Sequence, residues 1–383
     1  MRRFLGEPCC ASIFVRAGTF CLAYFAAAEL GHALSRESQD QLFVALWPPA
    51  GLLLAILTVS RYSLWIPLIL AAWVANLASD VLLHDTSVLA SLGHWVAHTV
   101  ESCLGAWLLR HFVGLPFTLT RLKEVVALVG FAVLFSPLAG ATLRAWFIVG
   151  GVADPAYKRF WQTWWIGDAL GVLLMAPVVF TWMAGSEISS QQFRPKRFAE
   201  ISILFVGIIL VTECVYGNWL PRYFQVPIFI LPFLLWAGLR LGPHSAANAL
   251  FVVALIGTWN VMQGRGPYTV ESDPLSDQVL RAQGALAGIS LSVLLLAANM
   301  AERNQAEQDR SLLLAKLQQA LAEIKTLRGF IPICGWCKSI RDDKDFWHSV
   351  EDYISDHSEV QFSHGICPEC LAKALVDLEK SDT

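Results

Sequence analysis

Gln278–Gly329 reads QVLRAQGALAGISLSVLLLAANM as far as Met300 and then AERNQAEQDRSLLLAKLQQALAEIKTLRG. The first part is apolar and long enough to cross the ~30 Å hydrocarbon core of a bilayer at about 1.5 Å rise per residue. The second part is rich in charged residues and glutamine, and no proline or glycine interrupts the join. One helix is therefore predicted to leave the membrane and continue as a stalk.

The polar part of this stretch carries a coiled-coil pattern. Its apolar positions alternate steps of four and three residues, which is the roughly 3.5-residue repeat of such a structure. The seam is Ala306, Arg310, Leu313, Leu317, Ala320, Ile324, Leu327 and Ile331. Only Arg310 breaks its apolar character. Because the stalks emerge from the same side of the membrane, the seam predicts a parallel homodimer.

Composition places the chain among polytopic membrane proteins. Of its 383 residues 55% are hydrophobic and 15% are charged, and the mean hydropathy is +0.51. A soluble globular chain has roughly 25% charged residues. The net charge of −3 gives no electrostatic case for nucleic-acid binding.

The predicted fold is an all-α membrane bundle of eight to ten transmembrane helices, followed by a coiled-coil stalk and a small zinc-binding α+β module. The bundle is assigned to residues 11–300, the linker to 301–329 and the module to 330–380. Ten spans are expected, or eight if two short ones are re-entrant. They are 11–34, 42–59, 63–83, 88–109, 124–149, 163–182, 200–218, 226–239, 245–261 and 278–300.

Loop charges predict the orientation. If the N-terminus is cytoplasmic, the inside loops hold ten Lys and Arg residues and the outside loops hold five. The positive-inside rule then favours two cytoplasmic termini, as in a multi-pass protein of the bacterial inner membrane.

Ionisable groups at membrane depth are the first functional candidates, since each costs about 2.5–3.5 kcal/mol unless it is paired or hydrated. His94, His98 and Glu101 fall at i, i+4 and i+7 of one span and share a helix face. They predict either a divalent-metal or proton-relay site, or a structural polar seam that pairs with Arg16, Arg144 or Arg281. Trp47, in WPPAGLLLA at the start of the second span, is expected to anchor that helix at the interface.

Three separated blocks of the bundle resemble signature stretches of a known family. They are WPPAGLLLA at Trp47–Ala55, WWIGDALGVLLMAPVVF at Trp164–Phe180 and LPFLLWAGLRLGPHSAANAL at Leu231–Leu250. In this order they resemble the MASE-one family of prokaryotic membrane-associated sensor domains, over about residues 11–303. The resemblance implies a sensor fused to signalling outputs and places Trp47 and Asp168 in the sensor core. The candidate ligand-binding residues are Trp47, Asp80, His94, His98, Glu101 and Asp168.

After the stalk, two Cys-x2-Cys pairs predict a metal site. Cys334 and Cys337 are followed, after twenty-nine intervening residues, by Cys367 and Cys370. Four thiolates suit tetrahedral Zn²⁺, which would replace the core that so short a domain cannot build. An iron–sulfur cluster is the less favoured alternative. His348, His357 and His364 are possible substitute or supporting ligands.

Within the module, the spacing of Phe346, Trp347, Val350, Tyr353 and Ile354 predicts one amphipathic helix, and LAKALVDLEK predicts a second. The runs KTLRGFIPICGWCKSIRDDKDFW and FSHGICPEC resemble a C-terminal module found in bacterial signalling proteins. This sequence departs from that pattern at Lys344-Asp345-Phe346, where a glycine-aromatic turn is usual.

No kinase, cyclase, phosphodiesterase or NTPase motif is found, so a non-enzymatic sensor is predicted. Its expected partner is a cytoplasmic two-component or cyclic-dinucleotide signalling protein. Two alternatives remain open: a transporter or channel that uses the intramembrane polar groups, and a thiol redox sensor at the four cysteines.

Overall fold

The structure is a computed structural model, and it describes residues 10–38, 41–149, 157–184, 195–219, 221–269, 272–328, 331–342, 344–357 and 361–381. The chain divides into two compact units, Met1–Ala306 and Glu307–Thr383. The division falls within one helix, a few residues beyond the predicted end of the bundle.

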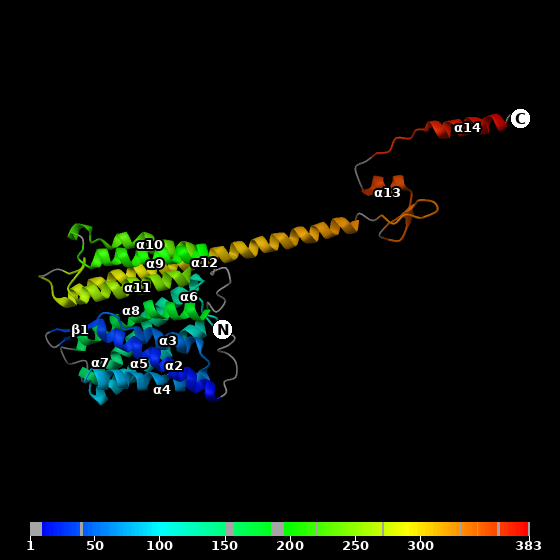
Figure 1. The fold of residues 1–383 in the computed structure, drawn as a ribbon. Coiled ribbons are helices and arrows are strands. Elements are labelled where there is room, and N and C mark those ends of the chain that lie inside the picture. The colour runs from blue at the N-terminus through cyan, green and yellow to red at the C-terminus, as the bar shows by residue number, and fades with distance from the viewer. Residues whose placement is uncertain are drawn as a thin grey trace. The chain divides into compact units, whose positions relative to one another are not determined.

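The first half of the bundle holds four long helical segments, a short helix and a two-stranded hairpin (Figure 1). The elements are α2 (Cys10–Ala33), β1 (Ser35–Ser38), β2 (Gln41–Val44), α3 (Pro48–Val59), η1 (Tyr62–Leu64), α4 (Trp65–Leu77), η2 (Ala78–Leu83), α5 (Val88–Phe112), α6 (Leu122–Ala127), η3 (Leu128–Phe135) and α7 (Ser136–Val149). β1 and β2 are antiparallel, with Ser35 opposite Val44.

The second half continues as helices. The elements are α8 (Tyr157–Ala184), α9 (Pro195–Tyr216), η6 (Arg222–Phe224), η7 (Pro227–Ile230), α10 (Leu231–Trp236), η8 (Ala237–Leu241), α11 (Pro243–Met262) and α12 (Leu275–Arg328). In the ribbon, α9 to α12 lie alongside one another, next to the helices of the first half (Figure 1).

Seven helices among the described residues are long and apolar enough to cross a membrane. Pro48–Val59 and Pro227–Leu241 are shorter apolar helices, and α5, with 25 residues, is long but more polar. Each of the ten predicted spans therefore coincides with a helical segment. The second predicted span, 42–59, is longer than its helix, because residues 41–44 form strand β2 and the helix begins at Pro48.

Three helical segments contain π turns: η2, η3 and η8. A π turn inserts an extra residue into the helical repeat and is frequent at functional sites. In η2 it lets the neighbours Ser79 and Asp80 both be buried.

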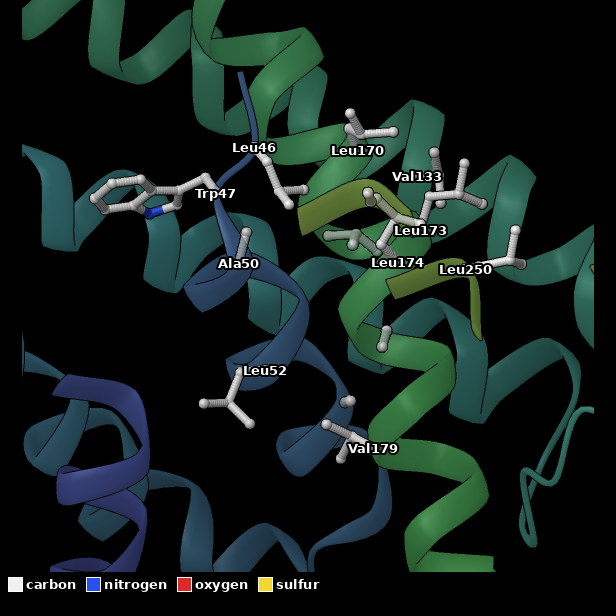
Figure 2. Close-up of a cluster of buried hydrophobic side chains, with 14 of the residues drawn as sticks. Leu46, Trp47, Ala50, Leu52, Val133, Leu170, Leu173, Leu174, Val179 and Leu250 are labelled. Atoms are coloured by element: carbon white, nitrogen blue, oxygen red, sulfur yellow. The ribbon is translucent and has the colours of Figure 1, made fainter. Parts of the chain in front are cut away.

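The core centres on the packing of α3 against α8, where Leu46, Leu170, Leu173 and Leu174 lie together (Figure 2). The two backbones approach closely because glycine occupies the contact: a Cβ on Gly171 would overlap the carbonyl of Trp47. Small residues let membrane helices approach in this way. The close fit fixes the start of α3 against the middle of α8.

The continuous helix predicted from Gln278 onward is confirmed: α12 runs unbroken from Leu275 to Arg328. Its bundle part buries one stripe, which is Val279, Ala282, Gln283, Leu286, Ser290, Val293, Leu294, Ala297 and Ala298. Its stalk part exposes Leu312, Leu313, Leu314, Leu317 and Leu321. The apolar stripe of the stalk is thus broader than the predicted seam.

The C-terminal unit contains a small hairpin and two helices: β3 (Ile340–Arg341), β4 (Trp347–His348), α13 (Val350–His357) and α14 (Pro368–Ser381). Arg341 pairs with Trp347 in the antiparallel hairpin. The prediction that Phe346 and Trp347 belong to the first helix is wrong. The Asp342 carboxylate accepts bonds from the backbone N–H groups of Lys344 and Phe346, and Asp345 adopts φ 66°, so the chain turns back as a strand first.

Candidate functional site

The polar face of α5 divides between two groups of side chains. His94 lies toward Asp80, with His94 Nδ1 3.8 Å from Asp80 Oδ2. His98 and Glu101, further along the helix, lie toward Asp168 of α8. The predicted convergence of His94, His98 and Glu101 on one site is therefore only partly met, because a helix face presents its ends to different neighbours.

The first group surrounds Asp80, which is almost fully buried. Asn76 Nδ2 donates to Asp80 Oδ2 at 2.7 Å, and His32 Nε2 lies 3.3 Å from Asp80 Oδ1. Asp80 therefore has polar neighbours on both oxygens. Close by, Ser79 donates to Glu29 at 2.6 Å, and the ring of His84 stacks on that of His32 at 3.8 Å.

The second group consists of His98, Glu101 and Asp168, which we call the inner cluster. One ligand atom from each lies within 4.8 Å of the others, and all three side chains are buried. Arg144 of α7 donates to Asp168 Oδ2 at 3.4 Å, and its guanidinium lies 3.9 Å from the ring centroid of Trp164. Arg144 thus pairs with Asp168, whereas the seam prediction expected an arginine to pair with His94, His98 or Glu101.

Most polar atoms of the inner cluster have no hydrogen-bond partner. They are His98 Nδ1, both carboxylate oxygens of Glu101 and Asp168 Oδ1, and Nε and Nη2 of the neighbouring Arg144 also have none. Buried polar groups in proteins are nearly always satisfied, so unmatched atoms at one point mark a place for something else to bind.

Trp47 connects the two groups, and the prediction that it is an interfacial anchor is wrong. Its side chain is buried, with its ring parallel to that of His98 at 6.1 Å and edge-on to that of His32 at 5.2 Å. In Figure 2 its ring points away from the leucines between α3 and α8. Hairpin β1–β2 precedes it, which lets the chain re-enter the bundle and carry Trp47 inward.

A residue that sequence reasoning missed joins this region to α12. Gln283 Nε2 donates to the carbonyl of Val44 at 3.2 Å and to that of Ala45 at 3.0 Å. Those carbonyls belong to the segment that leads into Trp47. A glutamine within an apolar span was a usable signal, but its partners are backbone groups more than two hundred residues away.

Each cysteine pair lies on a local hydrogen-bonded turn. Cys334 N–H donates to the Ser339 carbonyl at 2.8 Å, and Lys338 N–H donates to the Cys334 carbonyl at 3.0 Å. The Ser339 hydroxyl, 3.2 Å from Cys337 Sγ, lowers the pKa of the Cys337 thiol to about 7. Cys367 Sγ accepts from the Cys370 N–H at 3.4 Å at the start of α14, where a helix favours a thiolate.

The structure does not gather the four cysteines into one group. Within the described residues, which include all four, the inner cluster is the group of three or more potential ligands that lies together. The predicted four-thiolate site therefore stays a prediction.

Comparison with known proteins agrees with the resemblance seen in the sequence. The MASE1 family profile matches residues 17–304. The chain belongs to the MASE1 family. MASE1 is a polytopic membrane domain, and the match covers the bundle from within α2 onward, including Trp47, Asp80 and the inner cluster.

A relative of this MASE1 protein is described as "Probable diguanylate cyclase DgcE" of Escherichia coli (strain K12). It is 25% identical over 211 residues, which are 55% of this chain and 18% of the relative. The chain thus matches less than a fifth of that protein's length. No solved structure matches the chain.

The structure brings all six predicted ligand-binding residues into one part of the bundle. Asp80 and His94 contact each other, His98, Glu101 and Asp168 form the inner cluster, and Trp47 stacks on His98. Arg281 lies outside this set, since it pairs with Asp273 in the loop before α12.

Proposed function

We propose that this MASE1 membrane sensor is non-enzymatic and converts occupancy of the inner cluster into a movement of α12. The stalk passes that movement to the cysteine module, which docks a cytoplasmic partner. In this proposal the protein lies in the bacterial inner membrane with both termini in the cytoplasm, as the loop charges predict.

The observation that carries the proposal is the contact of Gln283 with the segment before Trp47. A ligand at the inner cluster touches His98, on which Trp47 stacks. Trp47 is continuous with Val44 and Ala45, whose carbonyls hold Gln283 of α12. Because α12 is one helix as far as Arg328, a rotation at Gln283 is transmitted along it.

The exposed leucines of the stalk support dimerisation. Leu313 and Leu317 occupy core positions of the predicted seam, and Leu314 and Leu321 widen it on one side. Exposed apolar stripes of this kind on a helix are normally covered by a partner helix. Helices that leave the same membrane on the same side pair in parallel, so the partner we propose is the stalk of a second copy.

The module supplies the docking end. In the proposal Cys334, Cys337, Cys367 and Cys370 bind one structural Zn²⁺, and the exposed aromatic rings of Trp336, Phe346 and Trp347 contact the partner. The diguanylate cyclase relative supports a cyclic-dinucleotide signalling context for that partner.

Photo-crosslinking of the full chain in native membranes tests the relay. A photoreactive benzoylphenylalanine at Leu317 should give a covalent dimer, whereas the same group at Ala315, on the opposite face of the helix, should not. Gln283→Leu removes both bonds to the Trp47 segment and should change the ratio of the two yields. Ser292→Ala is the matched control, because Ser292 bonds only to Gly288 of its own helix.

Equal yields at the two positions would contradict a fixed seam, and an unchanged ratio in Gln283→Leu would contradict the relay. Deletion of residues 301–329 also separates the sensor from a transporter, because transport by the bundle would survive that deletion while signalling would not.

A further inference from the structure

We infer that His98, Glu101 and Asp168 bind a first-row divalent transition-metal cation in the interior of the bundle. This inference rests on the proposed function, since it names the ligand of the same inner cluster. It concerns different residues from the predicted zinc site of the cysteine module.

The geometry supplies three donors from two helices. His98 Nδ1 lies 3.9 Å from Glu101 Oε2 on α5, and one potential ligand atom from each of His98, Glu101 and Asp168 on α8 lies within 4.8 Å of the others. Atoms bound to one metal ion at about 2.0–2.2 Å lie up to roughly 4.4 Å apart, so a small adjustment of side chains would close the shell.

The unpartnered atoms are the donors themselves. His98 Nδ1, both Glu101 oxygens and Asp168 Oδ1 have no hydrogen-bond partner, and the three residues are at most 1% exposed. Arg144 bonds the other oxygen of Asp168, which leaves Oδ1 free to face a cation while the guanidinium orients the carboxylate.

Charge also favours a cation. Two carboxylates lie together in the interior of the bundle, and among the described residues Arg144 is the cation paired with one of them, Asp168. The nearby Asp80 is occupied by Asn76 and His32. Buried like charges are costly unless they are neutralised, and a divalent ion between them offsets that cost.

The walls are shaped around the carboxylates. A Cβ on Gly140 of α7 would overlap Glu101 Oε2, so glycine keeps the position of this oxygen open. Trp47 covers the His98 ring. One imidazole with two carboxylates suits ions such as Mn²⁺, Fe²⁺ or Zn²⁺, whereas Mg²⁺ and Ca²⁺ prefer oxygen ligands alone and thiolate-seeking ions lack sulfur here.

Metal analysis of the purified full-length protein tests the inference. The four module cysteines are first replaced together by serine, so that any retained metal reports the bundle. This chain should carry about one ion of Mn²⁺ or Zn²⁺ after exposure to either and removal of excess, as expected of a single buried site with three protein ligands. Asp168→Asn and Glu101→Gln should each lower the retained metal about tenfold or more. Glu213 of α9 accepts a hydrogen bond from Asn260 and lies outside the cluster, so Glu213→Gln should leave the retained metal unchanged.

Melting of the four-serine chain provides the second measurement, in case a cluster variant does not fold. A chelator should lower its melting temperature, and added Mn²⁺ should restore it. If the chain retains no metal and the chelator has no effect, the inference is overturned. A proton shared by Glu101 and Asp168 is then left as the neutralising species. If the relay tests of the stalk succeed in that case, the proposed function stands with another ligand. If metal is retained but Gln283→Leu leaves the ratio of the two crosslinking yields unchanged, the cation site stands and the relay fails.

Discussion

The inner cluster and the cysteine module are both sets of potential metal ligands, but they form in opposite ways. His98, Glu101 and Asp168 are brought together by helix packing and are buried. Cys334, Cys337, Cys367 and Cys370 sit on local turns and, except for the half-buried Cys334, are exposed. The bundle forms its cluster from its own core, whereas in our proposal a metal ion holds the turns of the module together.

Removal of metal should therefore have its largest effect in the cysteine module. We expect a chelator, or Cys367→Ser, to make the remaining module thiols react rapidly with a maleimide, because the zinc-bound fold is lost as a whole. Cys21, which is half-buried in α2 away from both sets of ligands, provides the internal control and should react at an unchanged rate. Thiols that react equally fast with and without chelator would favour the redox reading of the module.

The second largest effect is expected from breaking the buried ion pair of the bundle. Arg144→Leu leaves Asp168 without its cation and should destabilise the protein by about 3–5 kcal/mol, measured by thermal or denaturant unfolding in detergent. The double variant Arg144→Leu, Asp168→Leu should recover much of this loss, since neither partner of the ion pair is then left buried without the other. A single variant as stable as the native chain would show that Asp168 is not charged in the bundle.

A smaller loss should follow from adding one methyl group between α3 and α8. Gly171→Ala places a Cβ against the Trp47 carbonyl and should cost about 1–3 kcal/mol, while moving Trp47 away from His98. Gly288→Ala is the matched control, because nothing lies near its Cβ and alanine favours a helix. Similar melting temperatures for the two variants would contradict the close approach.

The smallest change is expected in the hairpin of the module. Asp345 has φ 66°, a conformation that glycine adopts more easily, and its salt bridge to Arg341 is exposed. Asp345→Gly should therefore raise the melting temperature of the zinc-loaded protein's module transition by about 1–2 °C. A decrease would show that the ion pair matters more than the turn.

Several features could be predicted because they depend on neighbours in the chain. The helical segments, the unbroken α12 and the α5 face with His94, His98 and Glu101 follow from composition and period. The turn at Asp345 was visible only as a departure from a glycine pattern. Phe346 and Trp347 were misassigned because their spacing fits a helix, while the bonds of Asp342 to the backbone favour a strand.

By itself, the sequence determined a membrane bundle, a helical stalk that continues its last span, and a module with two cysteine pairs, because hydrophobicity, helical period and Cys-x2-Cys spacing are local properties. Tertiary structure alone decided that His94 faces Asp80 while His98 and Glu101 face Asp168, that Trp47 is buried against His98, and that Gln283 holds the segment before it. The physical reason is that a helical repeat fixes which side chains share a face. Only the packing of other helices decides what that face meets.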